Sequence, residues 1–351
     1  MAPSGEYFRA TVSGRRRGLW PGLQRGGLFL ASVPYGWAVR LRNWLYDRGW
    51  KRSRRVAVPV VSVGNLTLGG TGKTPCVEYV ARFYRRRERR VTILSRGYGS
   101  AAGPNDEALV LEENLDDVPH YQGPDRVALA LTAIEESESE VLVLDDGFQH
   151  RRLARDLDVV LIDATNPWGH GRLFPRGLLR EPPRSLRRAG VVVLTRCDQV
   201  DEAARARLRQ EVARWAPGVA VAETAHRPAE LVNGDRQTAG VDLLRGRPAA
   251  AFCGLGNPEA FRRTLDDLGA KVVAFRTFPD HHPYARADVE ELRAWAAQLA
   301  SECVVVTTQK DLVKLRLSQL GGRPLWALRI SLHFLAGQDA LDRKLEEVVG
   351  C

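Results

Sequence analysis

The amino-acid sequence predicts an α/β protein: a domain of the P-loop NTPase type with a mostly parallel sheet, plus a smaller second α/β domain joined by a β-ribbon linker. Three observations predict this fold class. Short β-branched runs alternate with amphipathic stretches, as in repeated βα units. The runs are apolar almost throughout, as in strands covered on both faces. A glycine-rich turn that ends in Gly-Lys-Thr follows the first run.

Charge is concentrated at one end of the 351-residue chain. Its net charge is +10, and residues 1–55 contain 12 Lys or Arg against two acids, so the rest is balanced. Such a basic arm suits an anionic surface, either lipid or nucleic acid. The five scattered cysteines form no CxxC pair, which fits a reducing cytosol. No run approaches the roughly 20 apolar residues of a membrane span, and we expect no secretory signal.

Residues 1–50 form the predicted arm, in which we expect 1–25 to be irregular because they are rich in Gly and Arg. A helix is predicted from Ser32 to Gly49, with Pro34 in its first turn. Its apolar stripe, at three- and four-residue spacing, consists of Trp37, Leu41, Trp44 and Leu45. The pattern leaves two interpretations open: a helix packed on the core, or one lying in a membrane interface with its arginines on lipid phosphates.

The first domain is predicted over 51–215 and the second, with the linker, over 216–351. Strands of the first domain are expected at 56–63, 91–95, 109–111, 141–144, 159–163 and 191–194, with helices at 77–87 and 126–136. The linker or β-ribbon covers 216–240 and should turn at Asn233-Gly234. In the second domain we expect strands at 249–253, 271–275 and 304–307 and helices at 258–268 and 287–299.

Residues 67–74 form the predicted phosphate loop. They are Thr67, Leu68, Gly69, Gly70, Thr71, Gly72, Lys73 and Thr74, and the strict pattern has glycine at the first position. The glycines allow backbone N–H groups to turn towards a phosphate, and the following helix adds its dipole. Lys73 supplies a positive charge and the Thr74 hydroxyl a ligand for Mg²⁺. The flanking strand and helix disfavour a chance Gly-Lys-Thr turn.

A second acidic element is expected where an apolar strand ends, to complete the Mg²⁺ shell. Asp145 and Asp146 directly follow the 141–144 run. Two aspartates after a strand often form only a turn, but together with the glycine loop they favour a metal site. The sequence therefore predicts a nucleoside triphosphate bound with Mg²⁺.

Other polar clusters have an ordinary surface interpretation beside a functional one. Asp106 could accept a hydroxyl proton or lie in a solvated loop. Arginines of the 166–186 loop, beside Glu181, suit an anionic substrate or a basic surface. Asp280, His281 and His282 lie on one turn and favour proton handling over zinc, since no further ligand pattern accompanies them; a capped turn is the alternative. Gly254 and Gly256 are spaced as in a dinucleotide-binding fingerprint, but the third glycine of that pattern is absent. We therefore do not expect a dinucleotide cofactor to bind there.

Several of these segments, taken in order, resemble the tetraacyldisaccharide 4′-kinase family of Gram-negative bacteria. The matching stretches are RNWLYDRG, VSVGNLTLGGTGKTP, LSRGYG, Asp106-Glu107, LDDGFQHRRL, LLREP, GLGNPEAF, FPDHH and KDLVKL. They extend from about Arg42 to Leu315. Asn105 and Gln309 depart from the family pattern, which has glycine and glutamate there. The resemblance implies two α/β domains with the active site between them, and transfer of the ATP γ-phosphate to the 4′-hydroxyl of a tetraacyldisaccharide 1-phosphate, giving lipid IVA.

The resemblance also implies roles for individual residues. Lys73 and Thr74 would serve the phosphates and Mg²⁺. The remaining assignments are Asp145, Asp146 and Glu181 at the metal, Asp106 as the base, His281 as its orienting or relaying partner, and Arg180 on the transferring phosphoryl group. Asp106 and His281 would then lie in separate domains.

The implied partners are a glycolipid substrate and an anionic membrane surface. The expected location is the cytoplasmic face of the inner membrane, as a peripheral protein, with no obligate protein partner and no nucleic acid. Two alternatives stay open: an NTPase switch or metallochaperone whose second domain binds a protein, and a nucleic-acid kinase. The aromatics of the arm lie on one helical face and form no base-stacking platform, which disfavours the second.

Overall fold

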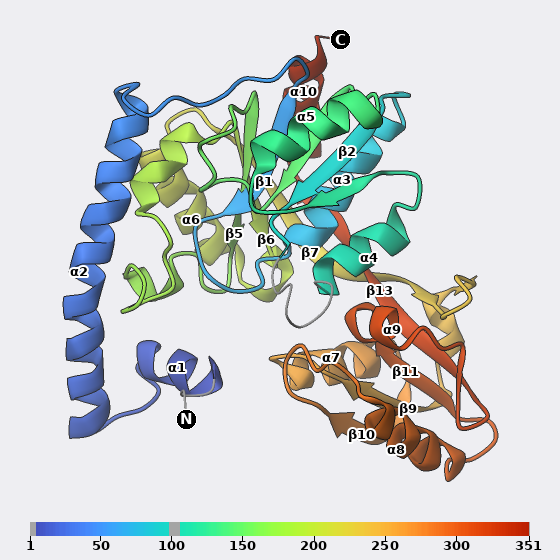
Figure 1. Cartoon of the computed structure of the whole chain (residues 1–351). Helices are drawn as coiled ribbons and strands as arrows, with labels where there is room; N and C mark the ends of the chain where they lie inside the picture. Colours follow the sequence, from blue (N-terminus) through green and yellow to red (C-terminus); the bar gives the residue numbers. More distant parts are fainter. Residues whose placement is uncertain (1–4, 98–105, 351) are drawn as a thin grey trace. The chain divides into compact units, whose positions relative to one another are not determined.

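The computed structural model describes residues 5–97 and 106–350, so Asn105 lies outside the described residues. Contacts divide the described chain into two compact units (Figure 1). Unit 1 comprises 5–97, 115–226 and 332–350, and unit 2 comprises 106–114 and 227–331. Strands β7 (Ala220–Val232) and β13 (Arg323–Ala336) are neighbours in the strand order, and each carries the chain from one unit into the other. Strand β7 lies within the predicted linker range of 216–240, whereas the sequence pattern did not predict its neighbour β13.

Unit 1 is built on a parallel sheet in the order β3-β2-β4-β1-β5-β6-β7. Its strands besides β7 are β1 (Val60–Asn65), β2 (Val91–Ser95), β3 (His120–Gln122), β4 (Val141–Asp145), β5 (Leu157–Asp163) and β6 (Val191–Thr195). The helices and 3-10 turns after β1 are α3 (Lys73–Arg85), α5 (Arg126–Glu136), η1 (Gly169–Gly171), η2 (Pro183–Arg188), η3 (Cys197–Gln199), α6 (Glu202–Trp215) and α10 (Gln338–Val349). Since parallel strands end at one edge, the loops after β1, β4, β5 and β6 meet there.

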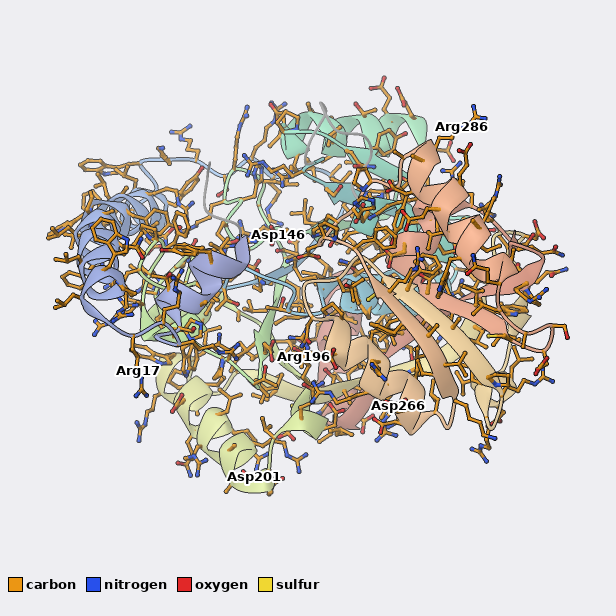
Figure 2. The ribbon with its side chains drawn as sticks, turned by 90° about the horizontal axis from the view of Figure 1, so that it is seen from below. Arg17, Asp146, Arg196, Asp201, Asp266 and Arg286 are labelled. Carbon is orange, nitrogen blue, oxygen red and sulfur yellow. The ribbon has the colours of Figure 1, made fainter. Side chains whose placement is uncertain are left out.

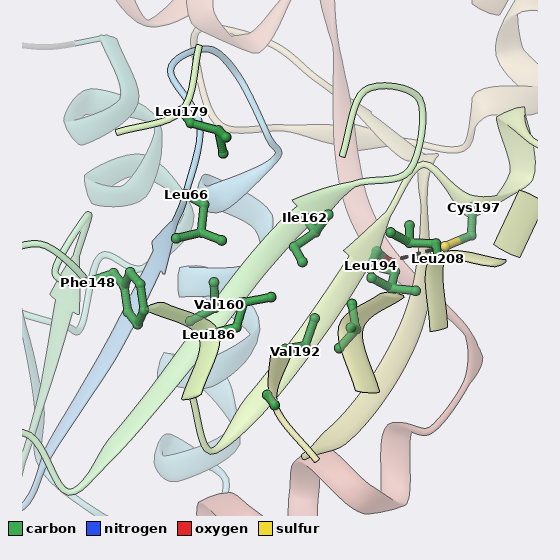
Figure 3. Packing of buried hydrophobic residues seen from close by; sticks show 12 residues of the cluster. Leu66, Phe148, Val160, Ile162, Leu179, Leu186, Val192, Leu194, Cys197 and Leu208 are labelled. Carbon is green, nitrogen blue, oxygen red and sulfur yellow. Dashed lines mark hydrogen bonds between the residues drawn. The ribbon is translucent and has the colours of Figure 1, made fainter. Parts of the chain in front are cut away.

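Helices cover both faces of this sheet. Val160 of β5 pairs with Gly64 of β1 and Val192 of β6, so these positions share a face. Leu208 and Val212 of α6 complete the core on this face (Figure 3). Helix α5 packs on the same face against β4, while α3 and α10 cover the other. The fully buried Tyr84 of α3 donates its hydroxyl to the Leu345 carbonyl of α10 at 2.8 Å.

Unit 2 has its own parallel strands in the order β10-β9-β11-β13. Its further elements are α4 (Asp106–Asn114), β8 (Thr238–Ala239), η4 (Val241–Leu244), β9 (Pro248–Cys253), α7 (Pro258–Asp267), β10 (Lys271–Thr277), α8 (Arg286–Ala297), β11 (Val304–Thr308), α9 (Gln309–Leu315) and β12 (Gln319–Leu320). The predicted turn at Asn233-Gly234 is confirmed, because Asn233 Oδ1 accepts hydrogen bonds from the Asp235 and Gln237 amides.

The basic arm is more helical than predicted. Helices α1 (Gly5–Val12) and α2 (Leu19–Asp47) cover much of the range expected to be irregular, and Pro34 lies inside α2, not in its first turn. Proline is the usual signal of a helix start, whereas here the helix continues through it despite the missing N–H. Among the described residues, no helix combines the length and apolar character needed to cross a membrane.

Segment 106–114 is the main departure from the predicted organisation. The strand expected at 109–111 is wrong, since these residues belong to helix α4. Although the segment lies within the predicted first domain, its contacts place it in unit 2, where α4 packs on α9. Gln309 of α9 donates to Asn114 Oδ1 at 2.6 Å and to Glu113 Oε1 at 3.1 Å. An amide at 309 can make these donations, whereas the glutamate of the family pattern could not.

Candidate active site

The phosphate loop lies between β1 and α3, where the glycine pattern predicted it. Gly72, in the left-handed region with φ 80°, precedes α3. Neighbouring elements hold the loop through its backbone and its Thr71 side chain. Thr195 Oγ1 donates to the Thr71 carbonyl at 3.0 Å, Arg196 Nη2 to the Gly70 carbonyl at 2.8 Å, and Asn65 Nδ2 to Thr71 Oγ1 at 2.9 Å. A fixed loop at a helix N-terminus is suited to binding phosphate.

His226, on strand β7, packs against Gly72 of the same loop. A Cβ atom at Gly72 would lie 2.0 Å from His226 Cε1, so glycine is required here by space as well as by φ. Burial lowers the pKa of His226 to about 4, which keeps its ring neutral near pH 7. Sequence reasoning missed His226, because no motif connects it to a loop that precedes it by more than 150 residues.

Lys73, Asp146 and Arg180, predicted from separate motifs, meet beside the loop. Asp146 Oδ1 lies 3.5 Å from Lys73 Nζ, and Asp146 Oδ2 lies 2.7 Å from Arg180 Nη1. Burial alone would raise the pKa of Asp146, but the charges of Lys73 and Arg180 outweigh it and lower that pKa below its ordinary value. Asp146 is therefore an anion held between two cations.

The residues predicted at the metal fit the chemistry of Mg²⁺. Asp145 is paired with Val63 in the β1–β4 register, one strand from the loop, and Thr74 lies in the first turn of α3. Magnesium binds oxygen ligands and usually keeps several waters, so one or two carboxylates suffice. Among the described residues, no cluster of three or more His, Cys, Asp or Glu side chains suited to a metal is found.

Glu181, also predicted at the metal, is fully buried and bonded elsewhere. Its Oε1 accepts from Arg42 at 2.5 Å, and its Oε2 accepts from Asn43 and Arg188, each at 2.9 Å. Burial would raise the pKa of Glu181, but the two arginines outweigh it and lower the pKa. A metal role for Glu181 stays a prediction, whereas its contacts connect helix α2 to η2.

The predicted base and its histidine meet inside unit 2. Asp106 Oδ2 lies 2.9 Å from His281 Nδ1 and 2.7 Å from Lys314 Nζ. Burial would raise the pKa of Asp106, yet the hydrogen bonds from His281 and Lys314 lower it overall. The expectation that Asp106 and His281 lie in separate domains is wrong, because both belong to unit 2. Sequence reasoning missed Lys314, one turn after Lys310 on α9.

Neighbouring residues that the motifs singled out have other partners. His282 Nε2 lies 3.0 Å from Asp288 Oδ2, so of the two histidines His281 is the one bonded to Asp106. Lys310 forms an ion pair with Glu107. Asp311 is fully buried and accepts hydrogen bonds from the Gly254 amide, the Tyr284 hydroxyl and the Thr308 hydroxyl. The first turn of α9 therefore connects helix α4 with the segments that carry Gly254 and Tyr284.

Comparisons with known proteins show to which family the chain belongs. A sequence model of the family described as tetraacyldisaccharide-1-P 4′-kinase matches residues 26–350. The tetraacyldisaccharide 4′-kinase of Anaeromyxobacter dehalogenans (strain 2CP-C) is 45% identical over 339 residues, which cover 91% of this chain and 89% of the relative. That of Geobacter metallireducens is 40% identical over 314 residues, with 84% and 90% covered.

A solved structure is also similar. The crystal structure of LpxK from Aquifex aeolicus, in complex with ATP, superposes with a TM-score of 0.77 at 32% sequence identity. The match covers 93% of this chain and 99% of that chain. On the family model and these relatives together, the chain belongs to the tetraacyldisaccharide-1-P 4′-kinase family.

Proposed function

We propose that this protein is a lipid A 4′-kinase, which transfers the γ-phosphate of ATP to the 4′-hydroxyl of a tetraacylated glucosamine disaccharide 1-phosphate. Membership of the family supports the reaction. One observation supports assigning the reaction to particular residues: Lys73 and Arg180 both contact Asp146 beside the phosphate loop. Cations and backbone N–H groups that converge at a helix N-terminus are what a transferring phosphoryl group needs.

At the donor end, residues 67–74 would hold the phosphates of ATP, with Lys73 on the β- and γ-phosphates. Arg180 would stabilise charge on the transferring group. Thr74, Asp145 and Asp146 would hold Mg²⁺, which when bound neutralises phosphate charge. Asp146 is kept ionised by its two cations, so it is already in the form that a metal ligand requires.

At the acceptor end, Asp106 would take the proton of the 4′-hydroxyl. Its lowered pKa keeps the carboxylate ionised near pH 7, and His281 and Lys314 fix its direction. His281 would orient Asp106 and relay the proton to solvent, since its own side chain is half exposed. The proposal requires unit 2 to bring Asp106 to the phosphate loop during turnover.

The acyl chains of the proposed acceptor also account for the exposed apolar and basic residues of the N-terminal arm. Each CH₂ group taken out of a bilayer costs about 0.8 kcal/mol, so the enzyme must approach its lipid. Helix α2 turns Trp37 (67% exposed), Leu41 (56%) and Trp44 (41%) outwards. Exposed arginines of the arm, such as Arg17 in Figure 2, add positive charge. These features support a seat for α2 on an anionic lipid surface, at the cytoplasmic face of the inner membrane where ATP is available.

A direct assay tests this function. Purified protein is incubated with γ-labelled ATP and the disaccharide 1-phosphate glycolipid in detergent micelles. We expect label at the 4′ position and almost none with Lys73→Ala. Lys51→Ala, a change of an exposed lysine in the turn after α2, is the matched control and should retain activity. Hydrolysis of ATP without labelled lipid would contradict the proposal and favour an NTPase switch.

A further inference from the structure

Residues 178–181 lie between the phosphate loop and helix α2. On one side, the Leu68 amide donates to the Leu178 carbonyl and the Arg180 amide to the Leu66 carbonyl, each at 2.7 Å. On the other, the Tyr35 hydroxyl of α2 donates to the Arg180 carbonyl at 2.9 Å. The backbone of Arg180 is therefore bonded both to the approach of the phosphate loop and to the arm.

Glu181 strengthens the connection to the arm. Its fully buried carboxylate accepts from Arg42 and Asn43 of α2, which lie 139 and 138 residues earlier in the chain. Arg188 of η2 donates to the same carboxylate. Leu179 and Leu186 flank this site and are buried in the core shown in Figure 3, so the segment between them is fixed to the sheet. A buried carboxylate bound by three donors holds its partners tightly, because losing one leaves charge uncompensated.

Helix α2 has two different faces, and could therefore connect a lipid surface with the interior of unit 1. Its inward face is made of small and polar buried residues, Ser32, Gly36, Val39 and Asn43. At Gly36 an added Cβ would lie 3.0 Å from Leu173, so the helix packs closely on the 166–186 loop. Its outward face carries Trp37, Leu41 and Trp44, the residues proposed to enter lipid. Asn43, which donates a hydrogen bond to Glu181, directly precedes Trp44.

From these contacts we infer that Glu181 is a positioning residue that couples the lipid-seated helix α2 to Arg180. Arg42, Asn43 and Tyr35 of α2 hold residues 180–181, and Arg180 is bonded to Asp146 beside the phosphate loop. A lipid surface that fixes α2 would make these contacts more persistent. The kinase would be most active where its acceptor resides. The inference rests on the proposed function, which supplies both the lipid seat and the role of Arg180.

Hydrogen exchange tests the coupling without any turnover. Vesicles of phosphatidylcholine with phosphatidylglycerol are added to the full-length protein, and exchange of peptides within 178–188 is followed by mass spectrometry. We expect exchange there to slow at least about threefold. In Asn43→Ala the vesicles should still bind, but the slowing should be lost. Ala38→Ser, an exposed and uncharged change on the same helix, is the matched control and should keep it.

Three results would overturn the inference: vesicles that fail to bind, unchanged exchange at 178–188 in the lipid-bound wild type, or full slowing in Asn43→Ala. These outcomes are independent of product formation, so a failed kinase assay contradicts the proposed function and not the coupling itself.

Kinetics separate a positioning role for Glu181 from a metal role. In Glu181→Gln, we expect kcat to fall at least about tenfold, because a misplaced Arg180 is costly. The Mg²⁺ concentration for half-maximal activity should stay unchanged, as should the affinity for ATP. A shifted Mg²⁺ dependence with kcat restored at high Mg²⁺ would identify Glu181 as a ligand and overturn the inference, as would an unchanged kcat.

Discussion

Gly72 shows, at the scale of single residues, how closely the phosphate loop is packed. In Gly72→Ala the new Cβ would meet His226 at 2.0 Å, at a φ of 80° that L residues rarely adopt. We expect ATP affinity, measured by calorimetry, to fall at least about tenfold, because the loop N–H groups are displaced. Gly240→Ala, outside the loop, is the control, since nothing lies within 4 Å of an added Cβ there. Equal losses in both variants would contradict this explanation.

Asp106 and His281 allow a matched comparison with a second Asp–His pair. Asp106→Asn should lower kcat by about 10²–10⁴-fold, the usual contribution of a general base, while ATP binding is kept. Asp288→Asn alters the His282 pair of the same unit and should change kcat little. Steady-state kinetics with both substrates makes the comparison. Wild-type activity in Asp106→Asn would remove Asp106 from the mechanism.

The pKa of His281 predicts a pH-dependent stability. Its hydrogen bond to Asp106 raises that pKa above the ordinary 6.5. A raised histidine pKa stabilises the fold fully below pH 6.5, and this contribution is lost as pH rises through the folded value. The difference in thermal midpoint between wild type and His281→Asn should therefore be largest near pH 6 and shrink by pH 9. A difference that grows with pH would show that the pair is not charged.

A local motif allows the position of a candidate residue to be predicted, while the role of that residue stays a prediction. Lys73 and Thr74 follow from the glycine loop, and Asp146 follows from the end of an apolar strand. Partners far apart in sequence could not be predicted in this way: Asn43 with Glu181, His226 with Gly72, and Lys314 with Asp106. Each of these pairs is created by packing between elements, which no spacing rule in one sequence encodes.

At the scale of elements, helix α2 makes the clearest prediction. Trp37→Ser with Leu41→Ser removes two exposed apolar side chains without touching its buried face. Flotation with anionic vesicles should fall at least about tenfold, because each large side chain contributes about 1.5–3 kcal/mol when buried. Trp215→Ser, at an exposed tryptophan (43%) on α6, is the control. Unchanged flotation would exclude α2 as the lipid contact.

Elements with a strong pattern were predictable, and those set by context were not. The strand at 91–95 and the helix at 126–136 appear with the predicted bounds. The short apolar run Leu109–Leu111 is compatible with a strand or a helix, so its pattern alone does not predict helix α4. The packing of this segment on α9 favours the helix. The predicted start of helix α2, at Ser32, is too late, because proline usually marks the first turn of a helix and Pro34 lies inside this one.

At the scale of the whole molecule, the residues that we propose to act in the reaction are divided between two units. Lys73, Asp146 and Arg180 belong to unit 1, and Asp106, His281 and Lys314 belong to unit 2. Segment 106–114 is inserted between β2 and β3 of unit 1, yet it packs with residues 200 positions later. The fold class was predictable from strand periodicity, whereas this insertion was not.

The central claim is that residues 67–74 hold the triphosphate of ATP. It is tested most directly by a crystal structure of the protein with Mg²⁺ and a non-hydrolysable ATP analogue. We predict the β- and γ-phosphates inside the loop, within hydrogen-bond distance of Lys73 and the Gly72 amide, and Mg²⁺ next to Thr74 and Asp145. An analogue bound elsewhere, with this loop unoccupied, would contradict the account.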